Sequence, residues 1–187
     1  MFIQTEETPN PASLKFIPDG QIVLENGVAD FKNQKQAATK SPLALQLFEI
    51  AGIDSVFFGR DFITVTKSEK FEWSKIKTEI LATIMDFFVS GKSVMFENAE
   101  KESVTNDEDS DIVKQIKELI EIKVRPAVAM DGGDIIYRGF EDGIVQLELR
   151  GSCSGCPSSS ITLKNGIENM LKHYIPEVLA VEQVFED

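Results

Sequence analysis

Hydrophobic residues recur along this chain with two periods, and these periods predict where helices and strands lie. Between Trp73 and Val89, apolar residues return every three or four positions, which predicts an amphipathic helix. The stripe consists of Trp73, Ile76, Ile80, Ile84 and Phe87. Ser41 and Pro42 predict another helix start, with serine as N-cap and proline at the first helical position, and Gly52 marks its end.

Short β-rich runs surround these helices. They are Phe2 to Thr5, Leu14 to Ile17, Ile53 to Phe58 and Asp61 to Thr66. Two prolines in Thr8-Pro9-Asn10-Pro11 predict a turn between the first two runs, and Gly59-Arg60 predicts a hairpin turn between the last two. The first half of the chain is therefore expected to be an α+β domain.

The second half repeats this mixture in a different order. A helical stripe from Ile112 to Val124 is expected to stop before Pro126, because proline disfavours the helical conformation of the preceding residue. A loop at 130–134 should follow, and then strands at 135–140 and 144–149 joined by Glu141-Asp142-Gly143. A second amphipathic helix carries the stripe Leu163, Ile167, Met170, Leu171 and Tyr174, and a third strand is expected at 178–185. The predicted order is α-β-β-α-β.

An acidic stretch separates the two halves. Residues 97–111 hold seven carboxylates and one lysine with almost no apolar side chains, so they cannot bury enough surface to order themselves. We therefore expect two small α+β domains, at 1–96 and 112–187, joined by a flexible linker at 97–111.

Charge limits the partners of the chain. The 187 residues carry 19 basic and 31 acidic side chains, a formal net charge of -12, which repels phosphate backbones and anionic lipid surfaces. We expect neither nucleic acid nor membrane partners. The chain has no apolar run long enough to cross a membrane.

The two cysteines of the chain lie three positions apart, as Cys153 and Cys156. They fall between the predicted second strand and second helix, and Pro157 suits the first turn of that helix. Unpaired backbone N–H groups and the positive end of the helix dipole then favour thiolate over thiol. The sequence places the candidate site at this CxxC pair.

Three kinds of site remain open for the pair: a thiol-disulfide oxidoreductase site, a structural zinc site in a dimer, and half of an iron-sulfur cluster site. Zinc sites and clusters both need about four ligands. His173 lies near the far end of the second helix and is a poor third ligand. Two ligands per chain imply that a four-thiolate site is completed by a second copy, a partner or a small thiol.

The segment Asp131-Gly132-Gly133-Asp134 offers a second group of carboxylates. Two carboxylates are too few for a calcium site, so we interpret the segment as a structural turn.

The motifs of the second half resemble a known domain. Met130-Asp131-Gly132-Gly133-Asp134, the cysteine segment 149–159 and the helix 162–168 resemble the C-terminal domain of NifU, the Nfu domain of iron-sulfur cluster biogenesis. Segments 8–11, 14–16, 41–44 and 56–65 resemble the N-terminal domain that accompanies it in Nfu proteins.

That resemblance implies a carrier rather than an enzyme. It implies that two protomers, each supplying Cys153 and Cys156, share a labile [4Fe-4S] cluster and pass it to apo iron-sulfur proteins. It also implies a homodimer when the cluster is bound, and upstream cluster assembly proteins as partners. Because the cysteine-rich scaffold and ferredoxin-like regions of full-length NifU are missing, late carriage is expected rather than primary assembly.

The N-terminus bears on location. No presequence precedes Phe2, so the sequence favours a bacterial cytoplasmic protein, with a processed mitochondrial matrix protein as the alternative.

Overall fold

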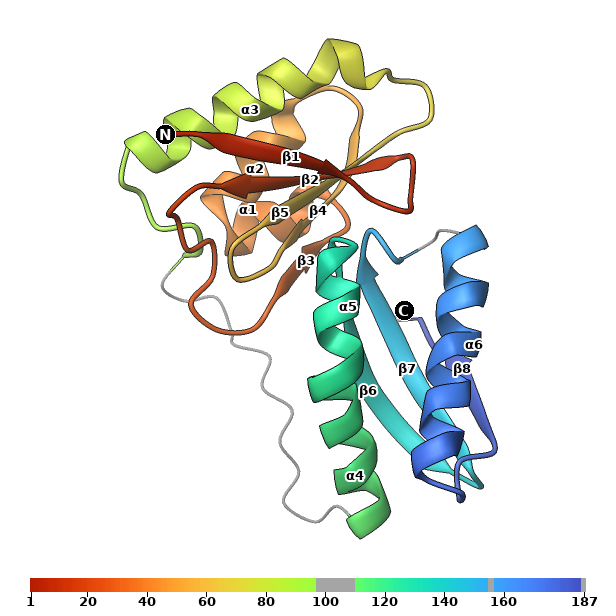
Figure 1. The fold of residues 1–187 in the computed structure, drawn as a ribbon. Coiled ribbons are helices and arrows are strands. Elements are labelled where there is room, and N and C mark those ends of the chain that lie inside the picture. Colours follow the sequence, from red (N-terminus) through yellow and green to blue (C-terminus); the bar gives the residue numbers. More distant parts are fainter. Residues whose placement is uncertain (97–109, 155–156, 186–187) are drawn as a thin grey trace. The chain divides into compact units, whose positions relative to one another are not determined.

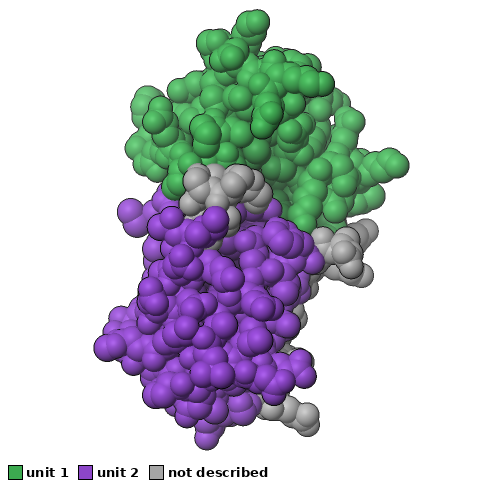
Figure 2. All heavy atoms as spheres, turned by 90° about the vertical axis from the view of Figure 1, so that its right-hand side faces the viewer, with its two compact units in different colours: residues 1–103 green, residues 104–187 purple. Residues whose placement is uncertain are grey.

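The computed structural model describes residues 1–96, 110–154 and 157–185. The chain divides into two compact units, Met1–Ser103 and Val104–Asp187, which Figure 2 distinguishes by colour. Both units combine helices with a sheet, so the prediction of a two-domain α+β protein is confirmed. The proposed linker lies outside the described residues except for its end, where Asp111 opens a helix.

Unit 1 is built on a five-stranded antiparallel sheet in the order β1-β2-β5-β4-β3 (Figure 1). Its strands are β1 (Ile3–Glu7), β2 (Ser13–Pro18), β3 (Ala29–Phe31), β4 (Ile53–Phe58) and β5 (Ile63–Lys67). Side chains alternate between its faces, so Leu14 and Phe16 of β2 join the core while Lys15 points the other way.

Within residues 1–96, the described part of unit 1, three helices accompany the sheet: α1 (Gln34–Lys40), α2 (Pro42–Glu49) and α3 (Trp73–Val89). Four residues of the predicted α3 stripe, Ile76, Ile80, Ile84 and Phe87, are buried in the core together with Phe16, Phe31 and Phe58, and the fifth, Trp73, is partly buried and packs against it. Ser41 caps α2 as predicted, with its Oγ accepting from the Ala44 N–H at 3.1 Å. The sequence did not predict β3 and α1, which are short and depend on packing against β4 and α2.

The described residues of unit 2 form one interrupted helix, a three-stranded sheet and a second helix. In order these are α4 (Asp111–Leu119), η1 (Ile120–Val124), α5 (Arg125–Met130), β6 (Gly133–Glu141), β7 (Ile144–Gly151), α6 (Pro157–Tyr174) and β8 (Ala180–Gln183). The sheet order is β6-β7-β8, with β6 and β7 antiparallel and β7 and β8 parallel. The core combines residues of α4, α5, β7 and α6, among them Ile116, Val128, Leu147 and Leu171.

The helix around Pro126 corrects one prediction. The sequence predicted a stop before this proline, but the helical backbone continues to Met130. A π-helical turn ends at Val124, two residues before the proline, and the Arg125 N–H donates to the Ile120 carbonyl five residues earlier. We attribute the continuation to this wider turn, which rearranges the carbonyls that the proline ring would otherwise meet.

The predicted loop at 130–134 is also wrong in extent. Met130 ends α5 and Gly133 begins β6, so only Asp131 and Gly132 connect helix to strand. The following hairpin turn is Asp142-Gly143, with φ of +50° and +80°, as a type I′ connection requires. The last strand, β8, covers four residues rather than the predicted 178–185. Among the described residues, no helix is both long and apolar enough to cross a membrane.

Candidate functional site

Cys153 lies two residues beyond the end of β7, where the chain leaves the sheet on its way to α6. It is buried, with 3% of its surface exposed, and belongs to the hydrophobic core of unit 2. Gly151 has φ +69°, a conformation that favours glycine and turns the chain away from β7. The Ser154 N–H donates to the Gly151 carbonyl at 3.1 Å and closes this turn. The end of the sheet therefore sets the position of Cys153.

The second predicted site residue, Cys156, lies outside the described residues. The helix expected after it does begin at Pro157. The structure therefore places Cys153 near the start of a long helix, but the geometry of the cysteine pair stays a prediction.

Asp131 and Gly132 form the corner between α5 and β6. Ser152, the residue before Cys153, is hydrogen-bonded to this corner. The Ser152 N–H donates to the Gly132 carbonyl at 3.2 Å, and its Oγ donates to the Asp131 carbonyl. The same Oγ lies 3.8 Å from the Cys153 Sγ. Asp131 and Gly132 thus act through their backbone carbonyls, as part of the structural turn that the sequence predicted.

Gly133 packs directly against the cysteine. It pairs with Gly151 at the end of the β6–β7 ladder. A Cβ built on Gly133 would lie 2.9 Å from the Cys153 Sγ and 2.6 Å from the Arg150 carbonyl oxygen. Only glycine lets the two strands and the thiol approach this closely without displacement.

Asp134, which the sequence assigned to a structural turn, is a buried carboxylate beside this corner, and sequence reasoning missed its pairing with Arg125. Its Oδ1 lies 2.9 Å from the Nε of Arg125. Burial raises the pKa of Asp134 above its usual value, and the positive charge of Arg125 opposes that shift. The available signal was an acidic residue directly before an apolar strand, but nothing in the sequence indicated Arg125 as its partner.

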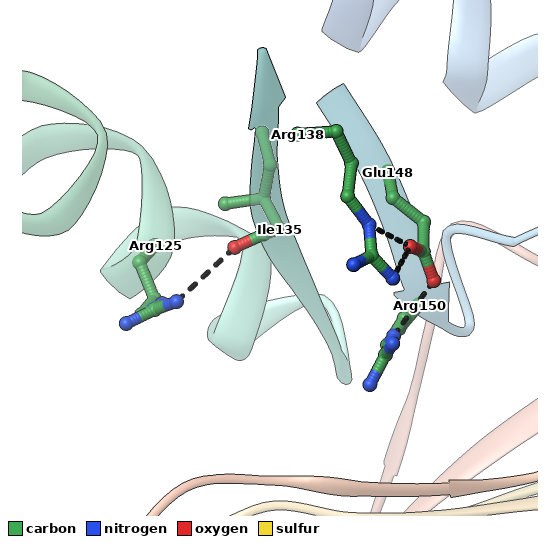
Figure 3. A network of polar contacts seen from close by, with 5 residues as sticks. All are labelled: Arg125, Ile135, Arg138, Glu148 and Arg150. Atoms are coloured by element: carbon green, nitrogen blue, oxygen red, sulfur yellow. Dashed lines mark hydrogen bonds and ion pairs between the residues drawn. The ribbon is translucent and has the colours of Figure 1, made fainter. Parts of the chain in front are cut away.

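Glu148 and Arg150 of β7 and Arg138 of β6 form a second group of ion pairs (Figure 3). The buried Glu148 accepts from the Arg138 Nε at 2.6 Å and from the Arg150 Nε at 2.7 Å. Burial alone would raise the pKa of Glu148, but the hydrogen bonds from Arg150 and Arg138 outweigh burial and lower it. This carboxylate therefore stays charged and joins the two strands.

Other ligand candidates are sparse. His173 lies in the last turn of α6, with its ring against that of Tyr174 at a centroid distance of 5.1 Å. Within residues 1–96, 110–154 and 157–185, no three His, Cys, Asp or Glu side chains are grouped so that they could hold a metal ion. A soft-ligand site in this chain therefore depends on the cysteine segment.

Two family models match the chain, and between them they include parts of both units. The model described as "Scaffold protein Nfu/NifU N terminal" matches residues 3–91, and the NifU-like domain matches residues 116–182.

Named relatives agree with these matches. The chain is 59% identical to "NFU1 iron-sulfur cluster scaffold homolog, mitochondrial" of Homo sapiens, over all of this chain and 73% of that protein. It is 52% identical to the protein of the same name in Drosophila persimilis, over all of this chain and 66% of that protein. A solution structure of a NifU-like protein from Saccharomyces cerevisiae is 29% identical, covers 52% of this chain and 87% of that one, and has a TM-score of 0.47.

These relatives correct the expected location and show the family. The human and Drosophila persimilis proteins are both named mitochondrial, so the expectation of a bacterial cytoplasmic protein is wrong. The position at which this sequence begins was not a sound basis for that expectation, because the chain spans only 66 to 73% of the lengths of these two relatives. On the identity to the human protein and on both domain models, the chain belongs to the Nfu/NifU family of scaffold proteins.

Proposed function

We propose that this protein is an iron-sulfur cluster scaffold that carries a [4Fe-4S] cluster on Cys153 and Cys156 and delivers it to apo-proteins. The observation that carries the proposal is the family membership of a chain whose two cysteines both fall in one segment between β7 and α6. Thiolates are the usual ligands of such clusters. The protein acts as a carrier rather than an enzyme, and its relatives favour the mitochondrion as its compartment.

Ligand number supports a shared site. A [4Fe-4S] cluster takes four thiolates, and one chain supplies two. A second copy of the chain supplies the remaining pair in the proposed homodimer. Because Cys153 is buried, its sulfur must become accessible before it can bind a cluster between two copies.

Delivery proceeds by ligand exchange. A thiolate of the acceptor binds an iron atom as one carrier thiolate leaves, and repetition moves the intact cluster without changing its oxidation state. Each released thiolate can then take up a proton. A site between two subunits makes this exchange accessible, whereas a fully enclosed ligand set would hinder it. Apo iron-sulfur proteins are the proposed clients, and upstream cluster assembly proteins the proposed donors. We also propose that residues 1–96 contact clients, with 97–111 as a tether to the cluster domain.

Anaerobic reconstitution with iron and sulfide tests the proposal. We expect about four irons and four sulfides per two chains, with a mass that changes from monomer to dimer on loading. Cys153→Ser and Cys156→Ser should each abolish loading, whereas His173→Ala should load normally. A colourless monomer that cycles a disulfide with thioredoxin reductase would instead identify an oxidoreductase. Zinc that iron cannot replace would identify a structural metal site.

A further inference from the structure

Arg125 ties the start of α5 to the edge strand of the sheet by two contacts. Its Nε lies 2.9 Å from Asp134 Oδ1, and its Nη2 donates to the Ile135 carbonyl at 3.3 Å. Figure 3 shows the guanidinium reaching toward that carbonyl from the helical arm. Glu121, one turn earlier on the π-helical segment, forms an ion pair with the Nη1 of Arg125 and steadies its side chain. One side chain therefore connects helix and strand on either side of the Asp131-Gly132 corner.

This corner holds the cysteine segment. Its two carbonyls each accept a hydrogen bond from Ser152, the residue before Cys153. Gly133, which follows the corner, packs against the Cys153 sulfur and stands next to Asp134. A change in the angle between α5 and β6 would therefore be transmitted to Cys153 over two or three residues.

The ion pair is better suited to fixing geometry than to adding stability. Asp134 has only 5% of its side chain exposed, whereas Arg125 has 40% exposed. The pKa of Asp134 is raised even with Arg125 beside it, because the cost of burying the carboxylate outweighs the attraction. Buried pairs of this kind contribute little net stability, but losing one partner leaves a charge without compensation.

We propose that Arg125 and Asp134 are positioning residues for Cys153: by fixing the α5–β6 corner, they keep the Cys153 thiol buried until a cluster is taken up or released. The biological meaning of this role rests on the proposed cluster function. The role itself concerns only the apo protein, and it can be tested without any cluster.

The test measures how fast iodoacetamide alkylates Cys153 in a Cys156→Ser background, where Cys153 is the single thiol. Because the thiol is buried, alkylation requires the segment to open, and its rate follows the population of open molecules. We expect Arg125→Gln and Asp134→Asn each to accelerate alkylation about tenfold, which corresponds to about 1.4 kcal/mol in the opening equilibrium. The alkylation rate of the double variant should be close to that of either single variant, since both changes break the same contact. The alkylation rate of Arg125→Lys should lie between those of the background protein and Arg125→Gln, because lysine keeps the charge but loses the planar fork of donors.

The matched control is Lys172→Gln, which breaks an ion pair with Glu168 on α6. It should leave the alkylation rate within about twofold of the background protein. Repeating each measurement at low urea concentrations separates local opening from global unfolding. Local opening exposes little surface and so depends weakly on urea, whereas global unfolding follows the full equilibrium slope.

Acceleration with a weak urea dependence, together with an unchanged control, supports the proposal. Unchanged alkylation in Arg125→Gln and Asp134→Asn would overturn it. Acceleration with the urea dependence of global unfolding would also overturn it, because the pair would then be merely structural. If reconstitution of the parent protein fails while the alkylation result holds, the cluster function is wrong and the positioning role stands.

Discussion

Gly133→Ala is the substitution whose effect the structure predicts most directly. The new methyl group would lie 2.6 Å from the Arg150 carbonyl oxygen and 2.9 Å from the Cys153 Sγ. Both contacts are shorter than van der Waals contact. The oxygen belongs to a backbone paired with β6, so the strands must separate or the cysteine segment must shift. Overpacking of this kind costs about 2 kcal/mol, and we expect unit 2 to lose that much free energy of unfolding.

Urea unfolding can assign this loss to unit 2. The single tryptophan, Trp73, belongs to unit 1, whereas both tyrosines belong to unit 2. The tyrosine signal should therefore shift to lower urea while the tryptophan signal does not move.

Gly166→Ala provides the matched control. Gly166 lies in α6, and a Cβ there would meet nothing within 4 Å. Alanine should stabilise this helix by about 0.5–1 kcal/mol through its higher helix propensity. The reasoning fails if Gly133→Ala changes stability by less than about 0.5 kcal/mol, or if the control loses as much as the test variant.

Three further predictions concern other side chains of unit 2. Because the pKa of Glu148 is lowered in the fold, its stabilising effect is present above its unfolded pKa near 4.5 and is lost as the pH falls through the folded value. Glu148→Gln should therefore flatten the acid limb of the curve of stability against pH. It should also cost about 2 kcal/mol at pH 7, because the charged acceptor of the hydrogen bonds from buried Arg150 and from Arg138 is lost. An unchanged acid limb would refute this prediction. Glu168→Ala should speed hydrogen exchange of the Val181 amide, which donates to that carboxylate at 3.0 Å; equal exchange in both proteins would contradict this. Cys153→Ser should lower the stability of unit 2 by about 1 kcal/mol, because a hydroxyl replaces an apolar thiol in the core; thermal unfolding at the wild-type temperature would show that the site is not core-like.

Local patterns were sufficient for the long elements. The stripe from Trp73 to Phe87 specified α3, and Ser41-Pro42 specified the start of α2, because periodicity and capping act within a few residues. The Asp-Gly turn between β6 and β7 was equally readable, since few residues accept positive φ at both turn positions. The local rule that a helix stops before proline failed at Pro126, where a π-helical turn and the packing of Val124 and Val128 in the core let the helix continue.

The sequence by itself determined the two-domain α+β organisation, the family, and Cys153 and Cys156 as the candidate ligands. Each of these follows from neighbouring residues: the period of apolar side chains, the spacing of two thiols and the motifs around them. The tertiary structure alone decided that Cys153 is buried, that Gly133 packs on its sulfur, and that Arg125 meets Asp134 nine positions later in the chain. These contacts form only when helix and strand fold together. A charge pair across a corner follows neither the helical nor the strand period, so the sequence pattern could not reveal it.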